Sequence, residues 1–217
     1  MTPTHSPTLW LASGSPRRRE LLEQAGFVIA GRARPVSPVN ESLGSTESAE
    51  QGASRLARAK LAAALAGPDL PEGAVLLAAD TLVSGSDGRP LGKPADANDA
   101  ERMLADLAGG WHQITTAVAV GDGEERREAL VSSRLRLARL SSEEIRAYVA
   151  TGEPLDKAGG YGLQGLAGSF VEAVEGDCSA VVGLPLAATR RLLAAFGIRP
   201  AWMDRGEQGI QREFSNE

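Results

Sequence analysis

Cysteine and histidine are scarce in this chain of 217 residues, which contains one cysteine, Cys178, and two histidines. A single cysteine excludes a disulfide framework and a cysteine-based zinc site, and two histidines exclude a histidine-rich metal centre. Cys178 has no neighbouring base in the sequence, so we expect a small buried thiol there. Aromatic residues make up only 4% of the chain, so the core must be built from leucine, alanine and valine.

Long apolar runs and an excess of positive charge are also missing. No run of about 18 apolar residues occurs, which predicts no transmembrane helix. The first residues lack the charged and apolar regions of a signal peptide, so the expected location is cytoplasmic. The net charge of −5 is unlike that of a general nucleic-acid binder, which is usually basic. We expect no nucleic-acid partner and no membrane partner.

Lysine is rare as well, because the 23 basic residues include only Lys60, Lys93 and Lys157. In a chain so rich in arginine, a retained lysine can mark a place where a compact ammonium is needed and a planar guanidinium will not serve. Together with Arg18, the three lysines could neutralise a polyphosphate. The alternative is that all three are ordinary solvated surface residues.

Apolar patterns and turn residues predict an α/β fold with a mixed sheet and helices on its faces. The expected strands cover residues 9–12, 75–79, 113–120, 128–137 and 169–174, with a hairpin through 82–91. The expected helices cover residues 16–25, 46–66, 97–108, 142–150 and 184–196. Residues 32–45 and 153–168 lack a regular pattern. We expect a single domain over residues 1–198 and a polar C-terminal tail over 199–217.

The first strand and helix are joined by small and basic residues, SGSPRRR at positions 13–19. Ser15 followed by Pro16 is a strong helix start, with Ser15 as the N-cap. Free backbone N–H groups, the hydroxyls of Ser13 and Ser15, and the arginines together suit an anion, especially phosphate. The alternative is an ordinary Ser-Pro cap with exposed arginines.

Acidic residues provide candidates for metal binding and proton transfer. Asp80 follows a buried strand directly, and the end of such a strand faces the crevice where α/β proteins bind ligands. It could hold a metal or activate water, or it could simply cap a turn. Glu41, Asp80 and Asp156 are candidate oxygen ligands for Mg²⁺ or Mn²⁺.

Familiar catalytic and nucleotide-binding motifs are not present. Residues 160–165 match G-x-G-x-x-G, but they follow no strand and leave no room for the helix of a dinucleotide-binding unit. No Walker loop occurs, and no G-x-S-x-G elbow supports a serine hydrolase. We expect the glycines to make a tight loop that a ligand or another segment approaches closely.

Several segments together resemble the Maf family of nucleotide pyrophosphatases. They are LASGSPRR (11–18), ADT (79–81), GKP (92–94), HQITT (112–116), EPLDKAG (153–159), YGLQG (161–165) and VGLP (182–185). They run in the family's order from about Leu9 to Phe196. All three lysines fall on positions where the family pattern carries lysine.

The resemblance implies a fold and an activity. Maf-like enzymes cleave a nucleoside triphosphate between its α and β phosphates, with a divalent cation such as Mg²⁺ or Mn²⁺. They are thought to clear modified or surplus nucleotides and have been linked to arrest of cell division. The family fold, similar to that of inosine triphosphatases, has an elongated mixed sheet and two lobes flanking a cleft, often in a homodimer.

The resemblance also implies roles for residues of this chain. Asp80 matches the general base, and Glu41 matches an acid that helps Asp80 to bind the metal. Asn40 stands where the family usually has an acid, so the metal shell departs from the pattern. The positions that match phosphate-binding residues are Ser13, Arg18, Lys60, Lys93 and Lys157. We expect Arg18 and the lysines, with Lys60 and Lys93 as catalytic candidates, also to stabilise the leaving pyrophosphate.

Three further positions match the branch of the family that hydrolyses dTTP and UTP: Arg17, Thr81 and Gln164. The 7-methyl-GTP branch tends to carry tryptophan at the position of Arg17. The amide of Gln164 offers a donor and an acceptor, which suits a pyrimidine imide edge. The alternatives are a pyrophosphatase for 7-methyl-GTP or another modified nucleotide, and a nucleotide-binding septation regulator with little turnover.

Overall fold

The computed structural model describes residues 6–44, 46–68, 70–85 and 87–203. In chain order, its helices, strands and 3₁₀ turns are β1 (Thr8–Leu11), α1 (Pro16–Gln24), β2 (Ile29–Arg32), α2 (Ala49–Leu65), β3 (Ala74–Ser84), β4 (Pro90–Leu91), α3 (Ala97–Leu107), β5 (Trp111–Gly121), β6 (Arg126–Leu137), α4 (Ser142–Ala150), η1 (Glu153–Asp156), η2 (Ala158–Gly160), η3 (Leu166–Phe170), β7 (Val171–Glu175), α5 (Cys178–Val182) and α6 (Leu186–Ala195).

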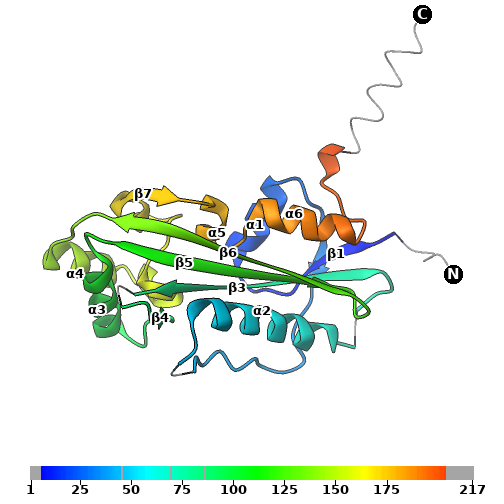
Figure 1. Ribbon diagram of the computed structural model, residues 1–217, viewed down its shortest axis with the longest axis horizontal. Coiled ribbons are helices and arrows are strands. Elements are labelled where there is room, and N and C mark those ends of the chain that lie inside the picture. Colours follow the sequence, from blue (N-terminus) through cyan, green and yellow to red (C-terminus); the bar gives the residue numbers. More distant parts are fainter. Residues whose placement is uncertain (1–5, 45, 69, 86, 204–217) are drawn as a thin grey trace, which may run out of the picture.

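Within these described residues, seven strands form one mixed sheet in the order β2-β1-β3-β5-β6-β7, with β4 also paired to β3. Strand β1 runs parallel to β2 and β3, and the other neighbours are antiparallel. The long strands β3, β5 and β6 give the molecule its elongated shape (Figure 1). The predicted α/β class, with a mixed central sheet between helices, is confirmed.

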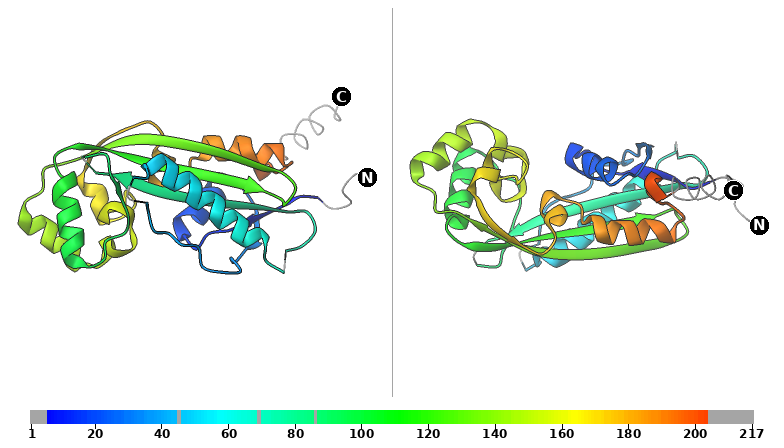
Figure 2. Two further views of the ribbon diagram at one scale, coloured as in Figure 1. Left: turned by 60° about the horizontal axis from the view of Figure 1, so that its bottom comes forward. Right: turned by 90° about the horizontal axis from the view of Figure 1, so that it is seen from above.

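Helices cover both faces of the sheet, and strand β3 contributes to the core on each side. Side chains alternate along a strand, so Val75, Leu77 and Ala79 pack with α1 and α6, whereas Leu76 and Ala78 pack beneath α2. Helices α3 and α4 lie together at one end of the sheet with the 3₁₀ turns η1 and η2 (Figure 2). A third apolar cluster holds that end together.

A gap along one edge of β3 positions the cleft described below. Strand β1 ends at Leu11, whose partner on β3 is Leu77. On the same edge, β4 pairs with β3 only at Val83 and Ser84. Between these points, residues 78–82 of β3 have no strand neighbour on this edge in the described part of the chain. Side chains from both faces of β3 can therefore reach the same opening.

The strand that carries Asp80 is longer than predicted. Asp80 does not follow the end of a strand, because β3 runs without interruption from Ala74 to Ser84 and pairs with β5 along its length. The expected hairpin begins inside this same strand. The carboxylate nevertheless lies at an opening, because the neighbouring strand β1 has already ended.

Two short elements, β2 and α5, were not predicted. Strand β2 consists of Ile-Ala-Gly-Arg, a weak strand sequence, and forms through pairing with β1 at the edge of the sheet. Helix α5 has only five residues and is preceded by its N-cap, Asp177, whose carboxylate accepts hydrogen bonds from two backbone N–H groups. The prediction of a buried thiol is wrong, because Cys178 is the first residue of α5 and is exposed.

The predicted boundary at Ile198 stays a prediction. Just beyond it, Ala201 N donates to Gly26 O over 2.8 Å and Trp202 Nε1 donates to Ala25 O over 3.0 Å, so the start of the tail contacts the end of α1. Residues 204–217 of the predicted tail lie outside the described residues. Among the helices that are described, none is both long enough and apolar enough to cross a membrane.

Candidate active site

A cleft of about 850 Å³ opens beside the free edge of β3, between the start of α1, helix α2 and the loops around η1 and η2. All the site residues predicted from the sequence line this cleft, although they come from six separate segments of the chain. They are Ser13, Ser15, Arg17, Arg18, Glu41, Lys60, Asp80, Thr81, Lys93, Lys157 and Gln164, and Asp156 lines it too.

Arg18 is held by three hydrogen bonds at the floor of the cleft. Its Nε donates to Gly183 O over 2.9 Å, its Nη1 to Ser13 Oγ over 3.1 Å and its Nη2 to Thr81 Oγ1 over 3.3 Å. Burial lowers the pKa of Arg18 and nearby Asp80 opposes that effect. The hydroxyl of Thr81 also bonds Thr116, so within the protein Thr81 serves to orient Arg18.

The turn before α1 leaves several groups free for an anion. Ser15 occupies the N-cap position as predicted, but its hydroxyl makes no capping hydrogen bond. Instead, Ser15 N donates to Ser13 Oγ over 3.2 Å. The first N–H groups of an α-helix have no partner within the helix, so those of Arg17 and Arg18 face outward with the positive end of the helix dipole. This arrangement suits a phosphate.

Lys60 joins the two carboxylates that the sequence assigned to metal binding. Its Nζ lies 2.5 Å from Asp80 Oδ1 and 2.7 Å from Glu41 Oε1. The pKa of Asp80 is raised because the side chain is buried, although Lys60 and Arg18 act in the opposite direction. Partial burial acts to raise the pKa of Glu41, but the hydrogen bond and charge of Lys60, with the charge of Lys93, lower it overall.

This pair of carboxylates fits a metal whose remaining ligands come from the substrate. Mg²⁺ in phosphate-transfer sites is commonly bound through one or two carboxylates together with phosphate oxygens and water. The described residues contain no group of three or more His, Cys, Asp or Glu side chains that could hold a metal alone. Glu41 and Asp80 would therefore hold the cation only with a bound triphosphate.

The glycine-rich loop places Lys157 against the far wall of the cleft. Its Nζ donates to Glu153 O over 2.7 Å and to Asp156 Oδ1 over 2.6 Å. Asp156 is therefore an ion-pair partner of Lys157, and this hydrogen bond lowers the pKa of the carboxyl. A Cβ atom at Gly162 would lie 2.8 Å from Lys157 Cδ, so a larger residue there would push the lysine stem aside.

Sequence reasoning missed two residues that line the cleft, Arg32 and Tyr161. The Tyr161 hydroxyl lies 2.5 Å from His112 Nε2, and both side chains are buried behind the loop. Burial lowers the pKa of His112 from its usual 6.5 to about 4, so the ring is neutral at pH 7. His112 and Tyr161 begin the matching segments HQITT and YGLQG, but neither was named as a site residue, and Arg32 lay in no such segment.

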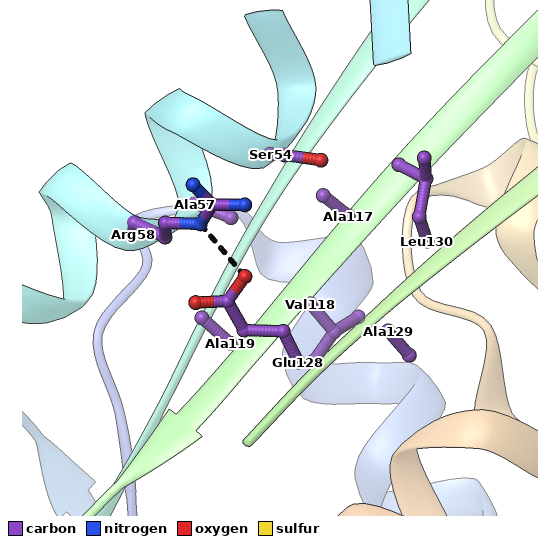
Figure 3. Close-up of a pocket in the computed structure, with 9 residues that line it drawn as sticks. All are labelled: Ser54, Ala57, Arg58, Ala117, Val118, Ala119, Glu128, Ala129 and Leu130. Atoms are coloured by element: carbon purple, nitrogen blue, oxygen red, sulfur yellow. Dashed lines mark hydrogen bonds and ion pairs between the residues drawn. The ribbon is translucent and has the colours of Figure 1, made fainter. Parts of the chain in front are cut away.

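A smaller hollow of about 230 Å³ lies elsewhere, between α2 and strands β5 and β6 (Figure 3). Four of its nine lining residues are alanines, and the ion pair between Arg58 Nε and Glu128 Oε2, at 2.7 Å, lies in it. Its charged groups are already paired with each other. The larger cleft is therefore the candidate active site.

The fold and this cleft define an α/β protein that is built to hold a polyanion beside a buried carboxylate. The chain belongs to the Maf family, whose model, described as "Maf-like protein", matches residues 8–196. The family prediction is thus confirmed.

Curated relatives match most of the chain. A dTTP/UTP pyrophosphatase of Shewanella frigidimarina is 50% identical over 186 residues, which are 85% of this chain and 95% of the relative. One of Salmonella typhimurium is 48% identical over 87% of this chain and 93% of its own length. One of Hahella chejuensis is 46% identical over 90% and 95%. A solved structure of the Staphylococcus aureus Ham1 protein matches 95% of this chain and 99% of its own, with 12% identity and a TM-score of 0.40.

Proposed function

We propose that this protein is a nucleoside triphosphate pyrophosphatase that hydrolyses dTTP and UTP to the monophosphate and pyrophosphate. The observation that carries the proposal is the position of Asp80, buried beside Lys60 in a cleft lined by Arg18, Lys93 and Lys157. The names of the relatives, which match this chain at 46–50% identity, support the choice of substrates.

The chemistry follows from the charges in the cleft. Asp80 accepts a proton from a water molecule while the water oxygen forms a bond to the α-phosphorus. The bond from the α-phosphorus to the bridging oxygen breaks, and pyrophosphate leaves with the electron pair. Lys60, Lys93 and Arg18 stabilise the charge that develops on the leaving group. A divalent cation, Mg²⁺ or Mn²⁺, bound by Glu41 and Asp80 would withdraw further charge from the triphosphate.

Recognition of the base is assigned to Arg17 and Gln164. Gln164 is exposed on the loop at the far wall of the cleft, where its amide is free to pair with a pyrimidine imide edge. Arg17 lies close enough to Asp156 for its charge to lower the pKa of that carboxyl, so it belongs to the same end of the cleft. We also propose a cytoplasmic enzyme, acting as a homodimer, with no nucleic-acid partner.

The test is pyrophosphate release from dTTP, UTP, CTP, 7-methyl-GTP and ITP, each with Mg²⁺, Mn²⁺ or EDTA. Metal-dependent turnover led by dTTP and UTP is the expected result. Turnover led by another base would keep the roles of Asp80 and the cations and discard those of Arg17 and Gln164. If the folded protein bound nucleotides without turnover, the proposal of an enzyme would give way to that of a nucleotide-binding regulator of septation.

A further inference from the structure

Arg32 lies over the phosphate-binding turn, although nothing in the sequence motifs points to it. It is the last residue of β2 and pairs in register with Leu11, the last residue of β1. Its side chain extends across Gly14, since a Cβ atom built at Gly14 would lie 2.7 Å from Arg32 Nη2. The guanidinium therefore rests on the backbone of the turn and lines the cleft.

The charge of Arg32 is not neutralised by a neighbouring acid. Arg55 and Arg58 form ion pairs with Glu47 and Glu128 at 2.6 and 2.7 Å. Lys60 and Lys157, within the cleft, also have carboxylate partners. Within the ranges that the structure describes, no carboxylate pairs with Arg32. A planar guanidinium next to outward-facing N–H groups is the arrangement that binds phosphate oxygens in pairs.

The position of Arg32 in the sheet indicates which phosphates it reaches. Strand β2 lies on the side of β1 away from β3, so Arg32 and Asp80 flank the turn from opposite sides. Asp80 acts at the α-phosphorus in the proposed reaction, and Gln164 holds the base beyond it. The phosphates nearest Arg32 are then the two that leave as pyrophosphate.

We propose that Arg32 is a substrate-binding residue that holds the β and γ phosphates against the turn. The proposal rests on the proposed function. Its probes are the two products, used as inhibitors: inorganic pyrophosphate and the nucleoside monophosphate. Arg32→Gln should weaken inhibition by pyrophosphate about tenfold, the effect of losing a charge-assisted hydrogen bond, and leave inhibition by the monophosphate unchanged.

Arg34→Gln is the matched control, because Arg34 is an exposed arginine two residues further on and does not line the cleft. It should behave as the wild type with both inhibitors. Equal pyrophosphate inhibition of wild type and Arg32→Gln, or a loss confined to the monophosphate, would overturn the proposal. If the wild-type protein released no pyrophosphate from any nucleotide, the proposed function itself would be overturned.

A second variant tests the contact itself. Gly14 does not adopt a left-handed φ, so alanine is compatible with its backbone. The added Cβ of Gly14→Ala would displace the flexible end of Arg32. Gly14→Ala should weaken pyrophosphate inhibition in the wild-type background and have little further effect in Arg32→Gln. If the double variant showed the product of the two separate losses in pyrophosphate inhibition, the contact between Gly14 and Arg32 would play no part in binding pyrophosphate.

Discussion

At the scale of single residues, Lys60 opposes the effect of burial on the pKa values of two carboxylates. Its ammonium contacts both Asp80 and Glu41, so it stabilises the charged carboxylates that burial disfavours. A carboxylate that is to accept a proton gains from a raised pKa, whereas one that is to bind a metal gains from a low pKa. Burial and Lys60 together therefore set whether Asp80 is ionised at the working pH.

Replacing Asp80 tests its role directly. Asp80→Asn should lower kcat for dTTP by about 100-fold or more, the usual contribution of a general base, because the amide cannot accept the proton. Thermal unfolding should change little, because the shape of the side chain is kept. Asp87→Asn, in the exposed turn after the same strand, is the control and should leave kcat unchanged. A folded Asp80→Asn enzyme with near wild-type turnover would contradict both the base and the ligand assignments.

The pH profile should depend on Lys60. Asp80 is active only when ionised, so kcat/KM should fall as the pH drops through its raised pKa. Lys60→Gln removes the cation that most favours the ionised form, so the residual activity should show this fall at a higher pH than in the wild type. Arg58→Gln, on the same helix but outside the cleft, should not move the profile. An unchanged profile in Lys60→Gln would refute the coupling.

His112 should make stability depend on pH. Its folded pKa of about 4 is below the usual value of 6.5, so the unfolded chain binds the proton more readily. The neutral ring therefore contributes roughly 3 kcal/mol to the free energy of unfolding above about pH 6.5. This contribution is lost as the pH falls from 6.5 through 4. Denaturant unfolding at several pH values measures this slope, which should be shallower in His112→Gln. Identical slopes would contradict a neutral buried histidine.

At the scale of elements, the shape of the glycine-rich loop depends on residues that have no side chain. Gly159 and Gly160 have φ values of +71° and +74°, which favour glycine. Gly162 makes room for the stem of Lys157. The loop thus folds as short 3₁₀ turns rather than as a helix, which agrees with the rejection of a dinucleotide-binding motif from the sequence.

Gly162→Ala should displace Lys157 from its place in the cleft. We expect a higher KM for dTTP with a smaller effect on kcat, because the lysine binds phosphate but does not take part in proton transfer. Gly110→Ala is the control, since a Cβ there would meet only Leu107 O at 3.8 Å. Steady-state kinetics measure both variants. A KM equal to that of the wild type would show that Lys157 does not contact the substrate.

At the scale of the whole molecule, the cleft lies between two walls that several separate segments of the chain build. The start of α1 and the uncovered stretch of β3 form one wall, and the loops around η1 and η2 form the other. A triphosphate that contacts both walls would bind only the folded chain. Binding should therefore add to the free energy of unfolding.

A dTTP analogue with a non-hydrolysable α,β bridge measures this linkage. At about 100 times its Kd, with Mg²⁺, it should stabilise the protein by ~2.7 kcal/mol, seen as a rise in Tm by calorimetry. Asp80→Asn should keep most of the rise, because Arg18 and the lysines still bind the phosphates although one ligand of the metal is lost. Thymidine at the same concentration is the control and should have little effect. No rise with the analogue would argue against nucleotide binding in this cleft.

The sequence alone determined the class of fold, the family and most of the helices. These features depend on local patterns: Ser48 and Ser141 start helices through capping boxes, and the motif segments are short and contiguous. Most of the candidate site residues lie in these motif segments, whereas Glu41 and Lys60 were named from their match to positions of the family. Their roles remain predictions, but the structure brings them to one cleft.

Features that depend on pairing between distant segments could not be predicted from the sequence and became apparent in the folded chain. Strand β2 exists because β1 lies beside it, and Asp80 is accessible because β1 ends where β3 continues. The bridge from Lys60 to Glu41 and Asp80 joins three separate segments. Arg32 and Arg34 look alike in the sequence, and only the pairing of β2 with β1 sets Arg32 against the turn. Spacing along a chain does not fix distance in space, because that distance depends on how the whole sheet closes around its core.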